Sequence, residues 1–95
     1  MSDIPTLIDI QSAAERIEKH IHRTPVLTNS AIDTMVDANL YFKCENFQKV
    51  GAFKARGALN AVLGLTEEEV SKGVATHSSG NHAAALALAA RSRGV

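Results

Sequence analysis

The chain has 95 residues, of which 45% are hydrophobic and 21% are charged, as in ordinary globular domains. Ten basic and ten acidic side chains give a net charge of zero, so the sequence lacks the basic surface that binds nucleic acid. The longest apolar run, 83–90, is far shorter than the roughly 20 residues of a membrane span, and the N-terminus lacks the features of a secretory signal. The single cysteine, Cys44, excludes an internal disulfide. We therefore expect a soluble, cytoplasmic protein that binds neither nucleic acid nor membranes.

The first half of the chain is predicted to form two helices and a strand. Apolar residues recur at helical spacing over 7–21, and Thr6 with Asp9 makes a capping pattern at the start of this helix. A Thr-Pro pair ends it, and a second, short helix is predicted over 30–37. Alternating apolar and polar residues over 40–45 predict a half-buried strand.

Helices and strands alternate in the second half. A loop over 46–51 leads to a helix over 53–63, and Thr66 with the acidic residues after it caps a short fourth helix. A strand is predicted over 74–77, and the turn after it opens a helix over 81–94.

This alternation predicts a parallel α/β architecture. Two strands alone do not form a stable parallel sheet, because such sheets need helices on both faces. The last helix carries only Ala and Leu over 83–90, so we expect protein to cover it on most sides. Both features lead us to expect that the chain is part of a larger protein.

The turn over 78–82 lies where ligands bind in open α/β sheets, between the end of a strand and the start of a helix. Free backbone N–H groups and the partial positive charge of a helix N-terminus attract anions there. Ser78, Ser79 and Asn81 add side-chain donors, and Gly80 allows a ligand to approach the backbone. The turn therefore predicts a carboxylate or phosphate site; the alternative is that Ser79 or Asn81 only caps the helix.

Lys54 lies in the first turn of a predicted helix, between the apolar residues Phe53 and Ala58. A lysine beside apolar groups at the positive end of a helix is suited to act as a nucleophile toward an aldehyde cofactor or a carbonyl substrate. An ordinary solvated lysine is the alternative, because lysine is common in this chain. His20 and His22 are too isolated in sequence from Cys44 and from carboxylates to indicate zinc, and His77 and His82 are expected in a strand and at a helix start, so no metal site is predicted.

Three segments together resemble one known family. Residues 43–58 (KCENFQKVGAFKARGA) and 76–83 (THSSGNHA) resemble the cofactor-lysine segment and the substrate-carboxylate loop of the serine racemase and threonine (serine) dehydratase family, and 22–27 (HRTPVL) also matches. This family consists of fold-type II pyridoxal-phosphate (PLP) enzymes, related to the β-subunit of tryptophan synthase. Within the family, residues 46–53 are most similar to serine racemase and 3-hydroxyaspartate dehydratase.

The resemblance implies an activity and a role for each matching residue. The activity is dehydration of L-serine- or L-threonine-type hydroxy-amino acids to a keto acid and ammonia, racemisation of these substrates, or both. Lys54 would hold PLP as a Schiff base and remove the substrate's Cα proton, with Phe53 beside the cofactor ring. Asn81 would hydrogen-bond the phenolic oxygen of PLP, and Ser79 would exchange a proton on the opposite face of the substrate. The substrate carboxylate would bind to Ser78, Ser79, Gly80, Asn81 and His82.

Other properties of the family map partly onto this chain. The nucleotide contacts of serine racemase would fall on Asn29, Ser30, Ala31, Lys49 and Val50. Three of these, Asn29, Ala31 and Val50, differ from the animal enzymes, which argues against activation by ATP. The resemblance also implies a homodimer for the full-length protein.

The resemblance further implies a division into two domains. Residues 1–68 would begin the larger, PLP-binding domain, and 73–95 would form the first βα unit of the smaller, substrate-binding domain. The glycine-rich phosphate loop, the residue facing the pyridine nitrogen and the acidic ligands of a Mg²⁺ or Ca²⁺ ion would lie beyond Val95. The isolated chain is therefore expected to have little or no activity.

Two other functions stay open. One is a related PLP lyase that acts on 3-hydroxyaspartate. The other is a non-catalytic module that binds amino acids, against which the presence of both Lys54 and Ser79 argues. A small α/β domain with chance matches is a third possibility, which the paired motifs make the weakest.

Overall fold

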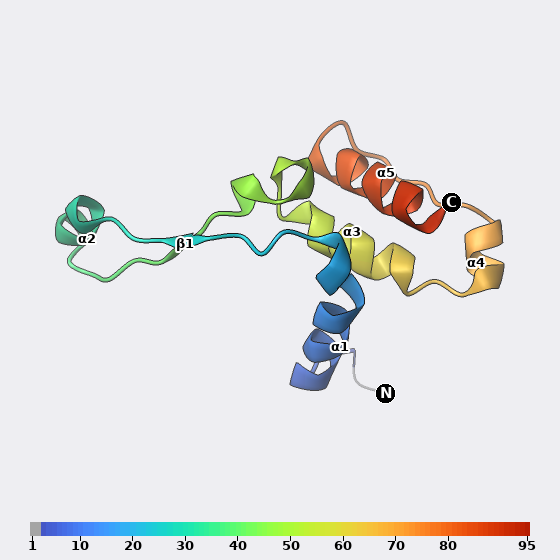
Figure 1. Ribbon diagram of the computed structural model, residues 1–95, viewed down its shortest axis with the longest axis horizontal. Helices are drawn as coiled ribbons and strands as arrows, with labels where there is room; N and C mark the ends of the chain where they lie inside the picture. Colours follow the sequence, from blue (N-terminus) through green and yellow to red (C-terminus); the bar gives the residue numbers. More distant parts are fainter. Residues whose placement is uncertain (1–2) are drawn as a thin grey trace.

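A computed structural model describes residues 3–95 of the chain (Figure 1). Its helices are α1 (Leu7–Ile17), α2 (Ser30–Val36), α3 (Lys54–Leu63), α4 (Glu67–Ser71) and α5 (Asn81–Arg93). Three 3-10 turns accompany them, η1 (Glu18–His20), η2 (Glu45–Phe47) and η3 (Lys49–Gly51). The strands β1 (Val26–Leu27) and β2 (Phe42–Lys43) pair antiparallel, with Val26 opposite Lys43.

The predicted helices form where local sequence signals place them. The Thr6 hydroxyl accepts a hydrogen bond from the Asp9 N–H, and the Asp9 carboxylate accepts one from the Thr6 N–H, which confirms the predicted capping box of α1. Thr66 and Glu69 cap α4 in the same reciprocal way. Hydrogen bonds of this kind satisfy N–H groups that a helix N-terminus leaves unpaired.

The core lies between α1, α3 and α5. Leu59 and Val62 of α3 are almost fully buried, and Ala85 and Ala89 of α5 pack against them together with Ile17 of α1. Because the α5 residues in this contact are alanines, the two helices can approach closely. Within the described residues, α5 buries Ala85 and Ala89, which face α3, so the cover predicted on its other sides stays a prediction about protein outside this chain.

Helices α3 and α5 run side by side in the same direction (Figure 1). At their C-terminal ends, Arg93 of α5 donates hydrogen bonds to the carbonyls of Val62 and Leu63 of α3. At the other end, α5 contacts η3, the turn just before α3. The N-termini of the two helices therefore lie at the same end of the pair.

An arm made of β1, α2 and β2 extends away from this core (Figure 1). The radius of gyration is 16.4 Å, against about 12 Å for a compact domain of this length. Leu27, Met35, Tyr41 and Phe42 on the arm are exposed. The arm therefore gains little apolar burial from the described part of the chain.

Two buried polar side chains attach the base of the arm to the segment before α3. The amide of Gln48, which is 3% exposed, accepts a hydrogen bond from the His22 N–H (2.9 Å) and donates one to the His22 carbonyl (2.8 Å). Thr24 is 5% exposed, and its hydroxyl donates a hydrogen bond to the Glu45 carboxylate at 2.6 Å. Residues 22–24 and 45–48 are thus held together by hydrogen bonds shielded from water.

Arg56 completes this link with a bidentate ion pair. Its Nε lies 2.5 Å from Glu45 Oε1, and its Nη2 donates to Oε2 at 3.0 Å. The hydrogen bond from Arg56 is the main reason that the pKa of Glu45 falls from 4.5 to about 2; burial, the next largest effect, raises this pKa, and the hydrogen bond from Thr24 lowers it. The same pairing raises the pKa of Arg56. Glu45 therefore fixes the first turn of α3, where Lys54 lies.

Two predictions about strands are wrong for residues 3–95. Residues 74–77 form no strand, and the strand predicted over 40–45 is reduced to Phe42–Lys43. A strand needs a neighbouring strand to accept and donate its backbone hydrogen bonds, and within the described range 74–77 has none. For the same reason the expected parallel strand pair is absent there, and the one observed pairing is antiparallel.

No helix within residues 3–95 is long and apolar enough to cross a membrane.

Replacing Leu59 by Ala tests the core. Leu59 is fully buried between α3, α1 and α5, so its loss should lower the free energy of unfolding by about 2–5 kcal/mol. Leu63→Ala, the same change one turn later at a half-buried position, is the control and should cost less. Denaturant unfolding of the natural protein that carries this sequence measures both; equal losses would contradict this packing.

Replacing Glu45 by Gln tests the ion pair through its pH dependence. Glu45 has a lowered pKa in the folded protein, so its contribution to stability is complete above about pH 5 and is lost as the pH falls toward about 2. At pH 7, Glu45→Gln should lower the free energy of unfolding by about 1–3 kcal/mol, and this difference should shrink between pH 5 and pH 2.

The control for this measurement is Glu18→Gln. Glu18 is exposed and has no ion pair or side-chain hydrogen bond within residues 3–95, so its substitution should change stability little at any pH. A Glu45→Gln difference that stays constant from pH 7 to pH 2 would refute the assigned pairing.

Candidate functional site

The loop before α3 presents Lys54 at the start of that helix. Gln48 caps η3 by accepting the Lys49 N–H, and its carbonyl accepts the Gly51 N–H at 2.8 Å. Val50 between them has φ 56° and ψ 13°, a left-handed conformation that costs a β-branched residue on the order of 1–3 kcal/mol. This strained conformation persists because the buried Gln48 holds the backbone before Val50 and α3 holds the backbone after it.

The Lys54 side chain is exposed, and its amine is available for chemistry. Its Nζ lies 5.2 Å from the centroid of the Phe53 ring, and it has no ion pair or hydrogen bond to any residue from 3 to 95. No side chain caps the N-terminus of α3. The predicted lysine therefore meets the first geometric requirement of a nucleophile, which is access to a reactant.

The loop over 78–82 is built around one hydroxyl. Ser78 Oγ accepts hydrogen bonds from the N–H groups of Gly80 (3.2 Å) and Ala83 (3.3 Å). Neither Ser79 nor Asn81 caps α5. The alternative prediction, that one of these two side chains caps the helix, is therefore wrong. Capping is present, but Ser78 does it.

This cap leaves three backbone donors of the turn unused. The N–H groups of Ser79, Asn81 and His82 have no hydrogen-bond acceptor among the residues described, and the side chains of all three are exposed. Unpaired N–H groups at a helix N-terminus bind anions such as carboxylates. The loop thus offers the donors that the sequence predicted for a carboxylate site.

The parallel packing of α3 and α5 brings the lysine and this loop to the same end of the helix pair (Figure 1). Each helix carries a partial positive charge at its N-terminus, so the two charges lie beside each other there. A negatively charged ligand would stabilise both. The residues present therefore fit an aldehyde cofactor bonded at Lys54 and a substrate whose carboxylate is bound at 78–82.

The predicted nucleotide residues do not form one cluster in this chain. Asn29 caps α2 by accepting the Ile32 N–H at 3.0 Å, and Ser30 and Ala31 begin that helix at the tip of the arm (Figure 1). Lys49 and Val50 lie in η3 beside the core.

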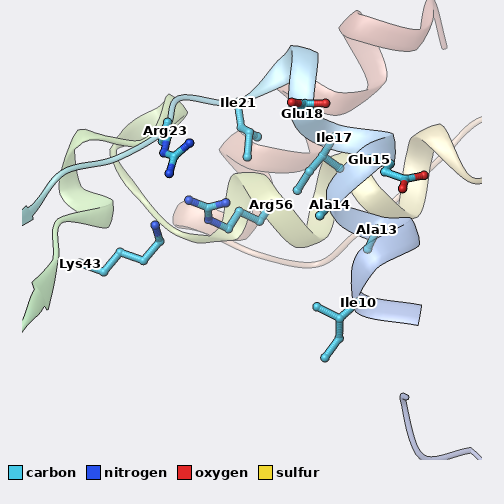
Figure 2. A pocket seen from close by; sticks show the side chains of 10 residues that line it. All are labelled: Ile10, Ala13, Ala14, Glu15, Ile17, Glu18, Ile21, Arg23, Lys43 and Arg56. Atoms are coloured by element: carbon cyan, nitrogen blue, oxygen red, sulfur yellow. The ribbon is translucent and has the colours of Figure 1, made fainter. Parts of the chain in front are cut away.

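A groove of about 640 Å³ lies elsewhere, between α1 and the base of the arm (Figure 2). Figure 2 shows Arg23, Lys43 and Arg56 on one side and the apolar residues of α1, among them Ile10 and Ile17, on the other. None of the predicted site residues lines it. Within the described range, no three His, Cys, Asp or Glu side chains cluster closely enough to hold a metal ion.

Sequence reasoning missed several residues that shape the site. Gln48, Glu45 and Arg56 lie inside the segment that carries the resemblance, but no local pattern indicated that they bond to His22 and Thr24, more than 20 residues away. The sequence predicts Ser78 as a substrate contact, whereas in the structure its hydroxyl accepts hydrogen bonds from the N–H groups of Gly80 and Ala83. A hydroxyl two residues before Gly80 was the available signal for that cap.

Comparison with known proteins shows what the chain is similar to. Residues 17–95 match the model of the family described as pyridoxal-phosphate dependent enzyme. The chain is 62% identical over 88 residues to a serine racemase from Dictyostelium discoideum, covering 93% of the chain and 27% of that protein. It is 56% identical over 92 residues to a beta-hydroxyaspartate dehydratase from Paracoccus denitrificans, covering 97% of the chain and 29% of that protein.

Solved structures agree in fold. A crystal structure of serine racemase from D. discoideum superposes with a TM-score of 0.91, covering 95% of this chain and 29% of that one. A threonine deaminase from T.th. superposes with a TM-score of 0.85 at 45% identity, covering 96% of this chain and 32% of that one. These neighbours confirm the predicted fold class, that of fold-type II PLP enzymes.

The chain spans less than a third of the length of these relatives. The matched family model nevertheless covers most of its residues, including the lysine segment and the 78–82 loop. The chain belongs to the family of pyridoxal-phosphate dependent enzymes.

Proposed function

We propose that the chain supplies the cofactor lysine and the substrate-carboxylate loop of an enzyme that dehydrates or racemises small hydroxy-amino acids of the L-serine and L-threonine type. The observation that carries this proposal is the parallel packing of α3 and α5, which puts Lys54 and the unpaired N–H groups of 78–82 at one end. The names of the relatives, serine racemase and beta-hydroxyaspartate dehydratase, support the reaction class.

Lys54 would both hold the cofactor and move a proton. Its exposed amine would bond the aldehyde of PLP, and Phe53, whose ring lies 5.2 Å from Lys54 Nζ, would pack against the cofactor ring. PLP supplies an electron sink that stabilises negative charge at the substrate's Cα. With the substrate bound, the Lys54 amine would lie near Cα and would accept its proton.

The 78–82 loop would orient the substrate. The N–H groups of Ser79, Asn81 and His82 bind the carboxylate, and Ser78 keeps the loop in shape through its bonds to Gly80 and Ala83. The Asn81 side chain is exposed beside these donors and would hydrogen-bond the phenolic oxygen of the cofactor. A substrate held at both its amine and its carboxylate presents one face to Lys54.

Ser79 would decide between the two products. Its exposed hydroxyl has no hydrogen-bond partner within residues 3–95. Proton delivery by Ser79 to the face opposite Lys54 gives the D-enantiomer. Without that delivery, loss of the β-hydroxyl leads to a keto acid and ammonia.

One alternative substrate has a specific observation in its favour. The Paracoccus relative named for beta-hydroxyaspartate is 56% identical, so an acidic side chain on the substrate is the second candidate. A non-catalytic amino-acid-binding module is the third candidate, and it requires no covalent bond between Lys54 and the cofactor.

The wider context is also part of the proposal. Residues 1–68 would belong to the larger domain and 73–95 to the smaller one, although Ala85 and Ala89 share a core with Leu59 and Val62. A homodimer in the cytoplasm is the assembly and location that the family resemblance favours. Asn29, Ser30 and Ala31 lie at the start of α2, whereas Lys49 and Val50 lie in η3, so the proposal includes no nucleotide site.

Reduction of the PLP-loaded protein tests the lysine. The natural protein that carries this sequence, incubated with PLP and reduced with borohydride, should carry a phosphopyridoxyl group on Lys54 by peptide mass spectrometry, because among the lysines within residues 3–95 it alone is exposed at the start of an α-helix. Lys54→Ala should lose the group, and Lys49→Ala, a change five residues earlier, should keep it. A folded protein without modification at Lys54 would favour the binding module.

Replacing Ser79 by Ala tests the second proton-transfer group. Racemisation of L-serine should fall by about 10²–10⁴-fold, as expected for loss of a general acid–base group, while release of keto acid should persist. The matched variant is Ser78→Ala, which removes the acceptor for two loop N–H groups and should weaken both reactions. Equal loss of both reactions in Ser79→Ala would show that Ser79 has no face-specific role.

A further inference from the structure

The C-terminal ends of α3 and α5 are joined by one side chain. Arg93 Nη1 donates to the carbonyls of Val62 (2.9 Å) and Leu63 (2.8 Å). Its Nη2 donates to the Leu65 carbonyl at 2.8 Å and to the Glu67 carboxylate at 3.0 Å. With 17% of its side chain exposed, Arg93 is largely enclosed, so a single guanidinium links α5 to the end of α3 and the start of α4.

This arrangement solves an electrostatic problem of parallel helices. The last carbonyls of a helix lack intrahelical partners and carry a partial negative charge. Here two such ends lie beside each other, and Arg93 is in the last turn of its own helix as well as against the carbonyls of the other. Its fixed, planar fork of donors suits several acceptors at once.

On the α5 side, the contact between the two helices is made largely by small residues, together with Leu86. Ala85 and Ala89 of α5 face Leu59 and Val62 of α3, and alanines form shallow ridges that interlock weakly along the helix axis. The directional hydrogen bonds of Arg93 at one end of the pair fix the position of α5 along the axis of α3. Because α5 has 13 residues, it is about 20 Å long. If its C-terminal end moves when Arg93 is lost, the helix moves as a rigid body and its N-terminus is displaced too.

We propose that Arg93 is a positioning residue that fixes the register of α5 against α3 and thereby holds the 78–82 loop in place beside Lys54. It touches neither cofactor nor substrate. The inference rests on the proposed function, in which Lys54 and the loop act on the same molecule.

Arg91 provides a matched control. It lies in the same last turn of α5, carries the same charge and is exposed, and its side chain has no ion pair or hydrogen bond to residues 3–95. Arg93→Ala and Arg91→Ala therefore remove equal charge from the same helix end, but only the first removes the link to α3.

The first experiment needs no cofactor. Amide resonances of 79–82 and hydrogen exchange in the first turn of α5 are compared in the natural protein, in Arg93→Ala and in Arg91→Ala. Arg93→Ala should shift these resonances and speed exchange by about tenfold or more, because local opening is easier without the link. Arg91→Ala should match the parent protein. Identical behaviour of the two variants would overturn the inference.

The second experiment uses the PLP-loaded protein with glycine as the probe, since glycine has the amine and carboxylate but no leaving group. Arg93→Ala should keep the phosphopyridoxyl group on Lys54 but raise the Kd for glycine roughly 10- to 100-fold. Arg93→Lys, which keeps the charge without the fork, should fall between Arg93→Ala and the parent, and it replaces Arg93→Ala if that variant does not fold. Glycine binding at the parent's Kd in both Arg93 variants would contradict the positioning role.

The two experiments separate this inference from the proposed function. If Lys54 takes no PLP in the parent protein, the proposed function fails, yet a loop displaced only in Arg93→Ala still supports the register role. If Lys54 is modified and the loop is unchanged in Arg93→Ala, the proposed function stands and the inference fails.

Discussion

The rest of the structure depends on the parallel packing of α3 and α5. Small residues, Ala85 and Ala89, let the two helices lie close against Leu59 and Val62. Parallel neighbours align their dipoles unfavourably, with two positive ends together and two negative ends together. Arg93 neutralises the negative end. At the positive end, unpaired N–H groups remain available to an anionic ligand. The parallel packing of α3 and α5 thus forms the core and also leaves backbone donors available for an anionic ligand.

The lysine is held in this arrangement by polar contacts rather than by apolar burial. Gln48 and Glu45 tie the loop before α3 to 22–24, and Arg56 carries the link into the helix itself. This rigid base tolerates the left-handed Val50 four residues before Lys54. Strain of this kind persists only where the surroundings over-determine the backbone, and it is common where a protein must present a reactive side chain in one orientation.

Features encoded by neighbouring residues were predictable from the sequence. The helices over 7–21, 30–37, 53–63 and 81–94 formed within a few residues of the predicted limits, because spacing, Thr6, Thr66 and helix-ending glycines act locally. In the first of these, α1 ends at Ile17 and continues as the 3-10 turn η1. The motif resemblance identified the family, which the family match over 17–95 confirms.

Features that depend on distant partners were not predictable. Residues 74–77 have strand-like sequence but no neighbouring strand in the described chain, and no local pattern reveals where a partner lies. Gln48 and Arg93 form hydrogen bonds to residues 26 and about 30 positions away in sequence. From the sequence alone, Arg93 is indistinguishable from an ordinary cation at the end of its own helix. Ser78 instead of Ser79 caps α5 because the backbone path of the turn decides which hydroxyl reaches Ala83. The roles assigned to Lys54, Ser79 and Asn81 stay predictions.

The most direct test of the central claim follows backbone amides while the PLP-loaded natural protein is titrated with glycine. If the α5 N-terminus binds the carboxylate, the amide resonances of Ser79, Asn81 and His82 shift most. Those of Gly80 and Ala83, which already donate to Ser78, shift less. Saturable glycine binding that leaves the first three amides unchanged would contradict the account, because the carboxylate would then lie elsewhere and the shared end of α3 and α5 would not be the site.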